Sequence, residues 1–401
     1  MDATSHLNAA RRARWAVAAI FLVNGFMTGS WAPQIPLVVS RLGITESTFG
    51  LLILCFGIGA LVSMPWCGWM VGRYGERGVL RLFSLLQGAG LLLVVLAPSV
   101  PVTAAAMLIF GALIGCTDVA MNAATVTVER RMGKAIMSSM HGFWSLGGFV
   151  GGAIGGIVLQ RYGALAHATG VAVIAILICA AAVPYLLAPL ASAAKATARR
   201  GLSMPTSPTV YLLGLLALLL FVSEGVVLDW GALYLSRERG ADIAVAGLAY
   251  AFFAGAMAIM RFAGDVIRDR FGAVLTLRVC ALVAAVSMAA VGFLDHPYLI
   301  IAAFSVSGLA LANTVPIVFS AAGNLPNVSS GAGVSVATTM GYSGILLAPS
   351  PIGLLAERVG YAPVFFIMGC LIFVVFLMSG LARTADFDHG AAAGATPEAR
   401  G

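Results

Sequence analysis

Three carboxylates interrupt stretches of this sequence that are otherwise apolar. Asp118 lies within residues 103–128, and Glu224 and Asp229 lie within residues 209–235. A carboxylate at the centre of a bilayer costs about 2.5–3.5 kcal/mol on insertion scales, so such residues usually face a wet cavity or a partner. We therefore predict that these side chains line a cavity in a membrane-embedded helix bundle and exchange protons there.

The candidates for proton transfer differ in depth. Glu224 lies about 15 residues, or roughly 22 Å, into its predicted helix, which makes it the expected proton carrier. Asp229 lies farther outward and has the alternative role of a polar residue near the outer mouth. The alternative for Asp118 is a structural pairing with an arginine or a helix terminus. His141 can titrate near neutrality, so it is predicted either to relay protons or to hold a structural hydrogen bond.

A second set of side chains has the chemistry to bind a sugar or polyol. Aromatic faces stack on C–H surfaces, while a few placed amides and hydroxyls bind the substrate's polar groups. The predicted set is Asn24, Trp31, Gln34, Asn122, Trp144, Asn313, Thr338 and Tyr342. The alternative for each aromatic residue in this set is packing within the bundle.

Membrane-spanning helices are the elements that must position these residues. Of the 401 residues, 60% are hydrophobic and only 10% are charged, whereas about one quarter of an ordinary soluble domain is charged. Apolar runs long enough to cross roughly 30 Å of hydrocarbon recur along the chain. We predict an all-α membrane protein with twelve spans, at 15–39, 47–71, 78–98, 103–128, 136–160, 165–189, 209–235, 244–267, 274–294, 298–321, 331–356 and 362–382.

The basic residues are distributed unequally between the two faces of this predicted bundle. Seventeen of the 23 lysines and arginines flank one face and five flank the other. The positive-inside rule therefore predicts that both termini are cytoplasmic. Because this bias also explains the net charge of +7, no nucleic-acid partner is expected. The six cysteines show no paired metal-ligand spacing, so no metal or cofactor is expected.

An internal repeat divides the chain. "NGFMTGSW" (24–31) parallels "EGVVLDW" (224–230), and Gly50 and Gly75 correspond to Gly247 and Gly272 at a shared offset of 197. Two similar bundles with a cavity between them are typical of secondary transporters. The predicted parts are a cytoplasmic tail (1–14), a six-helix bundle (15–189), a linker (190–208), a second six-helix bundle (209–383) and a disordered tail (384–401).

The loop after the second span of each half carries a repeated motif, "GWMVGRYGERG" (68–78) and "DVIRDRFGAVL" (265–275). Both resemble the Gly-x-x-x-Asp-Arg-x-Gly loop signature of the major facilitator superfamily. Gly72 replaces the acid in the first copy, and Asp265 replaces the first glycine in the second. The resemblance covers residues 15–383 and implies alternating access by rocking of the two halves. The residues assigned to this conformational switch are Gly68, Arg73, Gly75, Arg261, Asp265, Asp269, Arg270 and Gly272, with Arg261 expected to pair with Asp265.

Two further stretches bear on the direction of transport. "GGFVGGAIGG" (147–156) resembles the glycine motif of the antiporter branches of this superfamily. Small residues at this spacing also allow close helix packing without antiport, and we favour that interpretation. In "TDVAMNAATVTVERR" (117–131), Asp118 is followed four residues later by Asn122. This spacing resembles the fourth helix of proton-coupled permeases related to the fucose permease.

The segments "SWAP", "MHGFWSLGG", "SEGVVLDW" and "RFAGD" resemble the MosC-like branch of the superfamily. Together these resemblances predict a monomeric, proton-coupled carrier that imports a sugar, a polyol or a related metabolite across a bacterial inner membrane. The alternatives are a proton-coupled efflux antiporter for drugs or amphipathic metabolites, and a membrane receptor that does not transport. No nucleotide loop and no set of nucleophile, base and orienting residue indicates an enzyme.

Overall fold

The computed structural model describes residues 3–132, 136–187, 206–326, 328 and 330–386. Every regular element in these ranges is helical, as the sequence predicts. The first group of elements is α1 (Ala3–Leu42), α2 (Glu46–Leu86), α3 (Gly88–Leu96), α4 (Val100–Met132), α5 (Met137–Ala182) and η1 (Val183–Tyr185). The second is α6 (Pro208–Glu238), α7 (Ile243–Phe271), α8 (Ala273–Val291), α9 (Pro297–Leu311), α10 (Thr314–Gly323), α11 (Ser330–Leu347), α12 (Pro349–Val359), α13 (Tyr361–Met378) and η3 (Ser379–Ala385).

Helix α1 begins much earlier than the apolar run that predicts it. The helix starts at Ala3, whereas the predicted span starts at residue 15. Residues 3–14 contain neither proline nor glycine, and alanine and arginine are good helix formers, so the helix continues beyond its apolar part. Of the other predicted connections, most of the linker at 190–208 and most of the tail at 384–401 lie outside the described residues.

Two long helical stretches each contain a sharp bend. Residues Glu46–Leu96 and Ser139–Tyr185 form apolar stretches of 51 and 47 residues, and a straight helix of that length would measure about 70–77 Å. Gly75 and Gly163 interrupt these stretches with positive φ angles of 74° and 81°. Ten apolar stretches can be recognised over the described residues; because two of them are bent in this way, they account for the twelve predicted spans.

The backbone repeats itself with the offset found in the sequence. The glycines with positive φ fall into three pairs, Gly43 with Gly240, Gly75 with Gly272, and Gly163 with Gly360, and their φ angles agree within each pair. The same offset relates two helix starts, since Thr45 caps α2 by accepting from the Thr48 amide and Asp242 caps α7 by accepting from the Val245 amide. The two halves of the described chain therefore have matching turns as well as matching helices.

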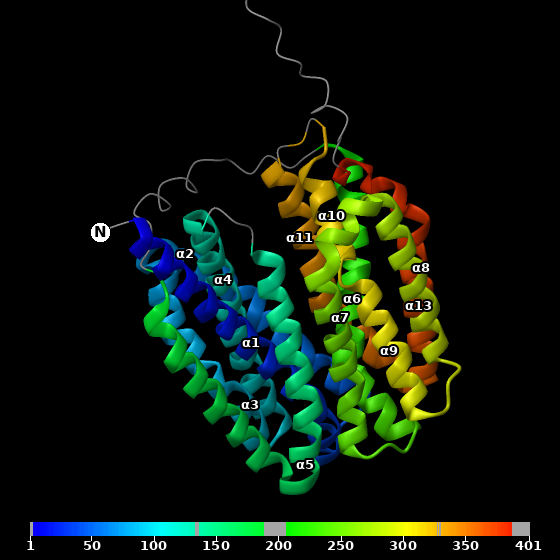
Figure 1. The fold of residues 1–401 in the computed structure, drawn as a ribbon. Coiled ribbons are helices and arrows are strands. Elements are labelled where there is room, and N and C mark those ends of the chain that lie inside the picture. The colour runs from blue at the N-terminus through cyan, green and yellow to red at the C-terminus, as the bar shows by residue number, and fades with distance from the viewer. Residues whose placement is uncertain (1–2, 133–135, 188–205, 327, 329, 387–401) are drawn as a thin grey trace, which may run out of the picture.

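The two groups of helices lie side by side (Figure 1). Helices α1–α5, blue to green in the picture, form the left side, and α6–α13, green to red, form the right side. Direct contact between the groups involves α5 with α7 and α2 with α12. We call the end of the molecule where α1 begins the near end and the end where α1 stops, at Leu42, the far end.

The repeated glycines of α5 are packing positions on two faces of that helix. A Cβ atom at Gly147 would lie 2.0 Å from the carbonyl oxygen of Leu22 in α1. On the neighbouring face, a Cβ atom at Gly156 would lie 3.0 Å from the carbonyl oxygen of Ala244 in α7. The glycine pattern thus brings α5 close to both α1 and α7, which is the packing role that we favoured from the sequence.

Candidate functional site

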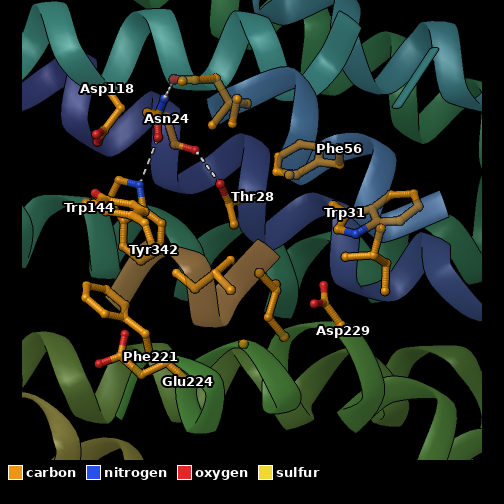
Figure 2. A pocket seen from close by; sticks show the side chains of 18 of the residues that line it. Asn24, Thr28, Trp31, Phe56, Asp118, Trp144, Phe221, Glu224, Asp229 and Tyr342 are labelled. Atoms are coloured by element: carbon orange, nitrogen blue, oxygen red, sulfur yellow. Dashed lines mark hydrogen bonds between the residues drawn. The ribbon is translucent and has the colours of Figure 1, made fainter. Parts of the chain in front are cut away.

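A cavity of about 290 Å³ lies between the two groups of helices, and residues of α1, α2, α4, α5, α6, α7 and α11 line it. Most of its walls are apolar or aromatic, with Phe56 from α2 and Phe221 from α6 as examples. Figure 2 shows side chains from both groups of helices projecting into this space. Polar and ionisable groups are few in its lining, so each of them has a large influence on what the cavity can bind.

Four of the predicted substrate-binding residues line the cavity: Asn24, Trp31, Trp144 and Tyr342. The indole nitrogen of Trp144 donates to Oδ1 of Asn24 at 2.9 Å, and Nδ2 of Asn24 donates to Oε1 of Gln87 at 3.1 Å. The ring of Tyr342 stacks on Phe221 with a centroid distance of 5.4 Å. The structure therefore provides aromatic faces at the cavity, while the Asn24 amide is already hydrogen-bonded.

The other four predicted binding residues are not among those that line the cavity: Gln34, Asn122, Asn313 and Thr338. Gln34 bonds with Nδ1 of His167 at 2.9 Å and donates to the carbonyl oxygen of Ala164 at 3.1 Å. Asn313 lies between α9 and α10 as the N-cap residue of α10. Polar side chains in membrane bundles also join helices to one another, and that use is invisible in a linear sequence.

All four candidates for proton transfer, Asp118, His141, Glu224 and Asp229, line the cavity. Asp118 accepts a hydrogen bond from Nδ2 of Asn122 at 3.3 Å, so the two residues share a helix face as predicted. His141 packs edge-on against the ring of Phe21, with a centroid distance of 5.3 Å. Within the described part of the chain, the ion pairs are those of Glu46, Asp295 and Glu224, and Asp118 is not among them.

Glu224 is paired with a basic residue of the cavity. Its Oε2 lies 3.9 Å from Nη2 of Arg261, and Nη1 of Arg261 donates to Oγ of Ser145 at 2.6 Å. Arg261 therefore contacts α5 of the first group and α6 of the second. The sequence analysis assigned Arg261 to the conformational switch with Asp265 as its partner, and the side chain of Asp265 lies outside the described residues. The sequence contains a feature that could have indicated this position. Arg261 falls within the predicted span 244–267, where a charge is costly unless it faces a cavity or a partner.

Asp229 differs from the other carboxylates. It is 8% exposed, and among the described residues it has no hydrogen bond or ion pair. Figure 2 places it on the side of the cavity near Trp31, while Glu224 lies beside Phe221. Tyr250 of α7 also lines the cavity. It was not predicted from the sequence, because a single tyrosine in an apolar span gives no distinguishing signal.

The residues of the repeated loop motif lie at the near end. Gly75 and Gly272 form the turns and have nearly identical backbone angles. Arg73 is exposed and lies 5.6 Å from the ring centre of Trp69, and Arg270 lies 5.6 Å from the ring centre of Phe271. Gly68 has open space around it. The side chains of Asp265 and Asp269 lie outside the described residues, so their predicted role remains a prediction.

The far end is closed by contacts between the two groups of helices. Glu46 at the start of α2 is ion-paired with Arg237 at the end of α6, and it accepts a hydrogen bond from the hydroxyl of Tyr361 at 3.2 Å. A Cβ atom at Gly50 would lie 2.6 Å from the carbonyl oxygen of Pro349. The side chains of Phe49 and Trp230 meet with their ring centres 5.3 Å apart. These contacts block the cavity on the side of Asp229.

Comparison with known proteins agrees with this architecture. A family model described as Major Facilitator Superfamily matches residues 17–349 and, again, residues 213–398. The chain belongs to the major facilitator superfamily. The second match begins in the second group of helices. Members of this family are membrane transporters, so the protein is a multi-pass membrane transporter of this superfamily.

Its relatives include transporters of similar length. The chain is 33% identical over 372 residues to an uncharacterised MFS-type transporter of Yersinia pestis, covering 90% of this chain and 93% of the relative. It is 31% identical over 350 residues to the membrane protein MosC of Rhizobium meliloti, covering 86% of this chain and 84% of MosC. This similarity bears out the branch predicted from the sequence segments.

Solved structures of the superfamily share the fold at low sequence identity. The nucleoside transporter NupG superposes with a TM-score of 0.69 at 13% identity and covers 92% of this chain and 98% of its own. A D-xylose-proton symporter superposes with a TM-score of 0.67 at 14% identity and covers 91% of this chain and 96% of its own. At these identities, the similarity concerns the arrangement of the helices.

Proposed function

We propose that this transporter couples the movement of a small metabolite to that of protons through the central cavity. The observation that carries the proposal is the pair of Glu224 and Arg261, with 3.9 Å between Oε2 and Nη2, at a cavity lined by both groups of helices. A buried carboxylate beside a guanidinium can exist in a charged, paired form and a neutral, protonated form. Each form presents a different charge to the cavity.

The contacts of Arg261 suggest how protonation is coupled to movement. Arg261 binds Ser145 of α5 and faces Glu224 of α6, so it links the two groups of helices. When Glu224 takes up a proton, the attraction between its carboxylate and Arg261 is lost. Of these two contacts, the hydrogen bond to Ser145 of α5 then remains. The loss of the attraction to Glu224 changes the forces on Arg261 at the boundary between α5 and α7. Alternating access needs such a change at the boundary that opens and closes.

The cavity supports a small substrate with a substantial apolar or aromatic part. Trp31, Trp144 and Tyr342 provide faces for stacking, which also suits the sugar or polyol expected from the sequence. However, Asn24 is engaged by Trp144 and Gln87, and the other predicted amides do not line the cavity. Fewer hydroxyl-binding groups are therefore present than the sequence predicts.

Export of an amphipathic compound is the second candidate function. The apolar walls favour it, because side chains such as Phe56, Met107 and Phe110 provide no partner for a highly hydroxylated substrate. The glycines of α5 do not contribute to this choice, since they serve helix packing. Symport and antiport differ in the direction of the pH gradient that drives uptake into vesicles.

The test is uptake by purified protein in proteoliposomes, with substrates first selected by thermal shift among sugars, polyols, nucleosides and amphipathic amines. We expect an imposed pH gradient to accelerate uptake by the wild type and to have no effect on Glu224→Gln, whose side chain cannot change charge. Asp295→Asn is the matched control, because Asp295 is highly exposed and is not among the residues that line the cavity. Equal stimulation of wild type and Glu224→Gln would reject coupling through Glu224.

We also propose that the protein lies in a bacterial inner membrane with both termini cytoplasmic. The support is the excess of arginine and lysine at the near end, where Arg73, Arg77, Arg268 and Arg270 lie close to the bends at Gly75 and Gly272. The near end would then face the cytoplasm. A fusion of alkaline phosphatase to the C-terminus, which is active only in the periplasm, should be inactive; an active fusion would reject this orientation.

A further inference from the structure

The cavity contains more negative than positive groups. Its lining includes the three carboxylates of Asp118, Glu224 and Asp229, but Arg261 provides its only guanidinium or ammonium among the described residues. Arg261 is directed to Glu224 and Ser145, and Asp118 accepts from Asn122. The remaining carboxylate, Asp229, is left without a partner in the described part of the chain although it is more than nine-tenths buried.

A buried carboxylate without a partner is unfavourable. Removing an ionised carboxylate from water costs several kcal/mol unless a cation or hydrogen-bond donors compensate it. Asp229 is five residues after Glu224 on α6, about 7–8 Å along the helix axis, and the ion pair of Arg261 is with Glu224. This arrangement points to a positive group that arrives from the cavity.

The surroundings of Asp229 restrict the kind of cation. Among the described residues, no cluster of three or more His, Cys, Asp or Glu side chains could hold a metal ion. Trp31 lies on the same side of the cavity (Figure 2), and aromatic faces attract organic ammonium groups. Phe56, Leu228 and Phe253 add apolar surface to the lining. A carboxylate, an indole face and apolar walls are the groups that recognise a protonated amine with an apolar body.

The volume of the cavity limits the size of this ligand. At about 290 Å³, the cavity is just below the roughly 300–1,000 Å³ range of small-molecule sites. The far end, beyond Asp229, is closed by the Glu46–Arg237 pair and the contact between Phe49 and Trp230. A ligand would therefore enter with its charged group leading toward Asp229 and its apolar body lying among the aromatic residues.

We propose that the substrate class of this transporter is small organic amines and that Asp229 is the counter-ion of their ammonium group. The inference rests on the proposed transport function, because it takes the central cavity as the substrate site. It goes beyond that function by assigning the charge of the substrate and by separating two roles. Glu224, which is paired with Arg261, takes up and releases the proton. Asp229 binds the ammonium group of the substrate.

The experiment measures binding to the purified full chain in detergent by thermal shift and by calorimetry. The probes are 2-phenylethylamine and cyclohexylamine, each compared with its neutral counterpart, 2-phenylethanol or cyclohexanol. We expect at least one amine to bind at least tenfold more tightly than its neutral counterpart. Asp229→Asn should reduce amine binding at least tenfold, Asp229→Glu should retain part of it, and Asp295→Asn should leave it unchanged.

Three results would overturn the proposal: no binding of either amine, equal binding of amine and alcohol, or amine binding that is unaltered in a folded Asp229→Asn protein. A melting temperature of the unliganded Asp229→Asn protein close to that of the wild type establishes that it is folded. If Asp229→Asn does not fold, loss of amine preference in Asp229→Glu, which keeps the charge, counts against the proposal. Binding is measured without a membrane gradient, so failure of pH-driven uptake in vesicles rejects proton coupling and leaves the amine site standing.

Discussion

At the scale of single residues, Arg261 is the basic partner of Glu224 in the cavity. It is only partly exposed and faces Glu224, which is also only partly exposed. Its hydrogen bond to Ser145 holds the guanidinium at the boundary between α5 and α7. In a low-dielectric site, a charge that loses its partner is much less favourable than a pair from which both charges have been removed.

This asymmetry gives a prediction for single and double substitutions. Arg261→Met should lower stability, because Glu224 must then be protonated or remain buried without compensation; fully buried pairs lose roughly 3–5 kcal/mol in such cases, and the partial exposure here implies a smaller loss. Arg261→Met combined with Glu224→Gln should recover most of that loss. Melting temperatures of the three proteins in one detergent at pH 7 provide the measurement. A double variant less stable than Arg261→Met would show that the two residues do not act as a pair.

At the scale of the elements, the bends between helices depend on glycine. Gly163 has a φ of 81°, and a Cβ atom there would meet no other atom within 4 Å. Any penalty for a side chain at this position therefore comes from the backbone conformation and not from a clash. Gly170, in the following helical part of α5, also has open space around it but has an ordinary helical conformation.

These two glycines form a matched pair for substitution. Gly163→Ala should destabilise the protein by about 1–3 kcal/mol, because alanine is strained at positive φ. Gly170→Ala should be neutral or stabilising by up to about 1 kcal/mol, because alanine favours a helix more than glycine does. Thermal unfolding of both variants beside the wild type tests the difference. Equal melting temperatures for the two variants would contradict the assigned backbone conformation of Gly163.

At the scale of the whole molecule, the structure shows a state that is closed at the far end. The closure depends on backbone contact at Gly50, on the Glu46–Arg237 pair and on the hydrogen bond from Tyr361. A side chain at Gly50 would meet the backbone of Pro349, which cannot move as a flexible side chain can. A larger side chain at position 50 should therefore destabilise the state that is closed at the far end.

We expect Gly50→Val to shift the population toward a state that is open at the far end. Gly68→Val is the control, because Gly68 is on the same helix and has open space around it. Spin labels at two exposed tyrosines report the separation by pulsed electron resonance. Tyr162 precedes the bend of α5 at Gly163, and Tyr298 lies at the start of α9 in the other group of helices. The distance distribution should lengthen in Gly50→Val and stay as in the wild type in Gly68→Val. An unchanged distribution in Gly50→Val would mean that this contact does not control closure.

The sequence by itself determined the helical membrane class, the repeat and the family. Hydrophobic runs determine which segments leave water, and the offset of 197 between Gly75 and Gly272 is a property of the linear chain. It also indicated Asp118, Glu224 and Asp229, because a charge in an apolar span is costly wherever the helix lies. It could not place the ends of α1 or the bend at Gly163, where hydropathy changes little.

Only the tertiary structure decided which polar residues reach the same space. Gln34 and Asn24 are both buried amides of α1, yet Gln34 bonds to His167 while Asn24 lines the cavity. Arg261 faces Glu224 from a different helix, and Asp229, five residues beyond Glu224, is left unpaired by the side chains that the structure describes. The rotation of each helix about its axis and the neighbours it meets set these partners, and both arise from packing between segments that are distant in the chain.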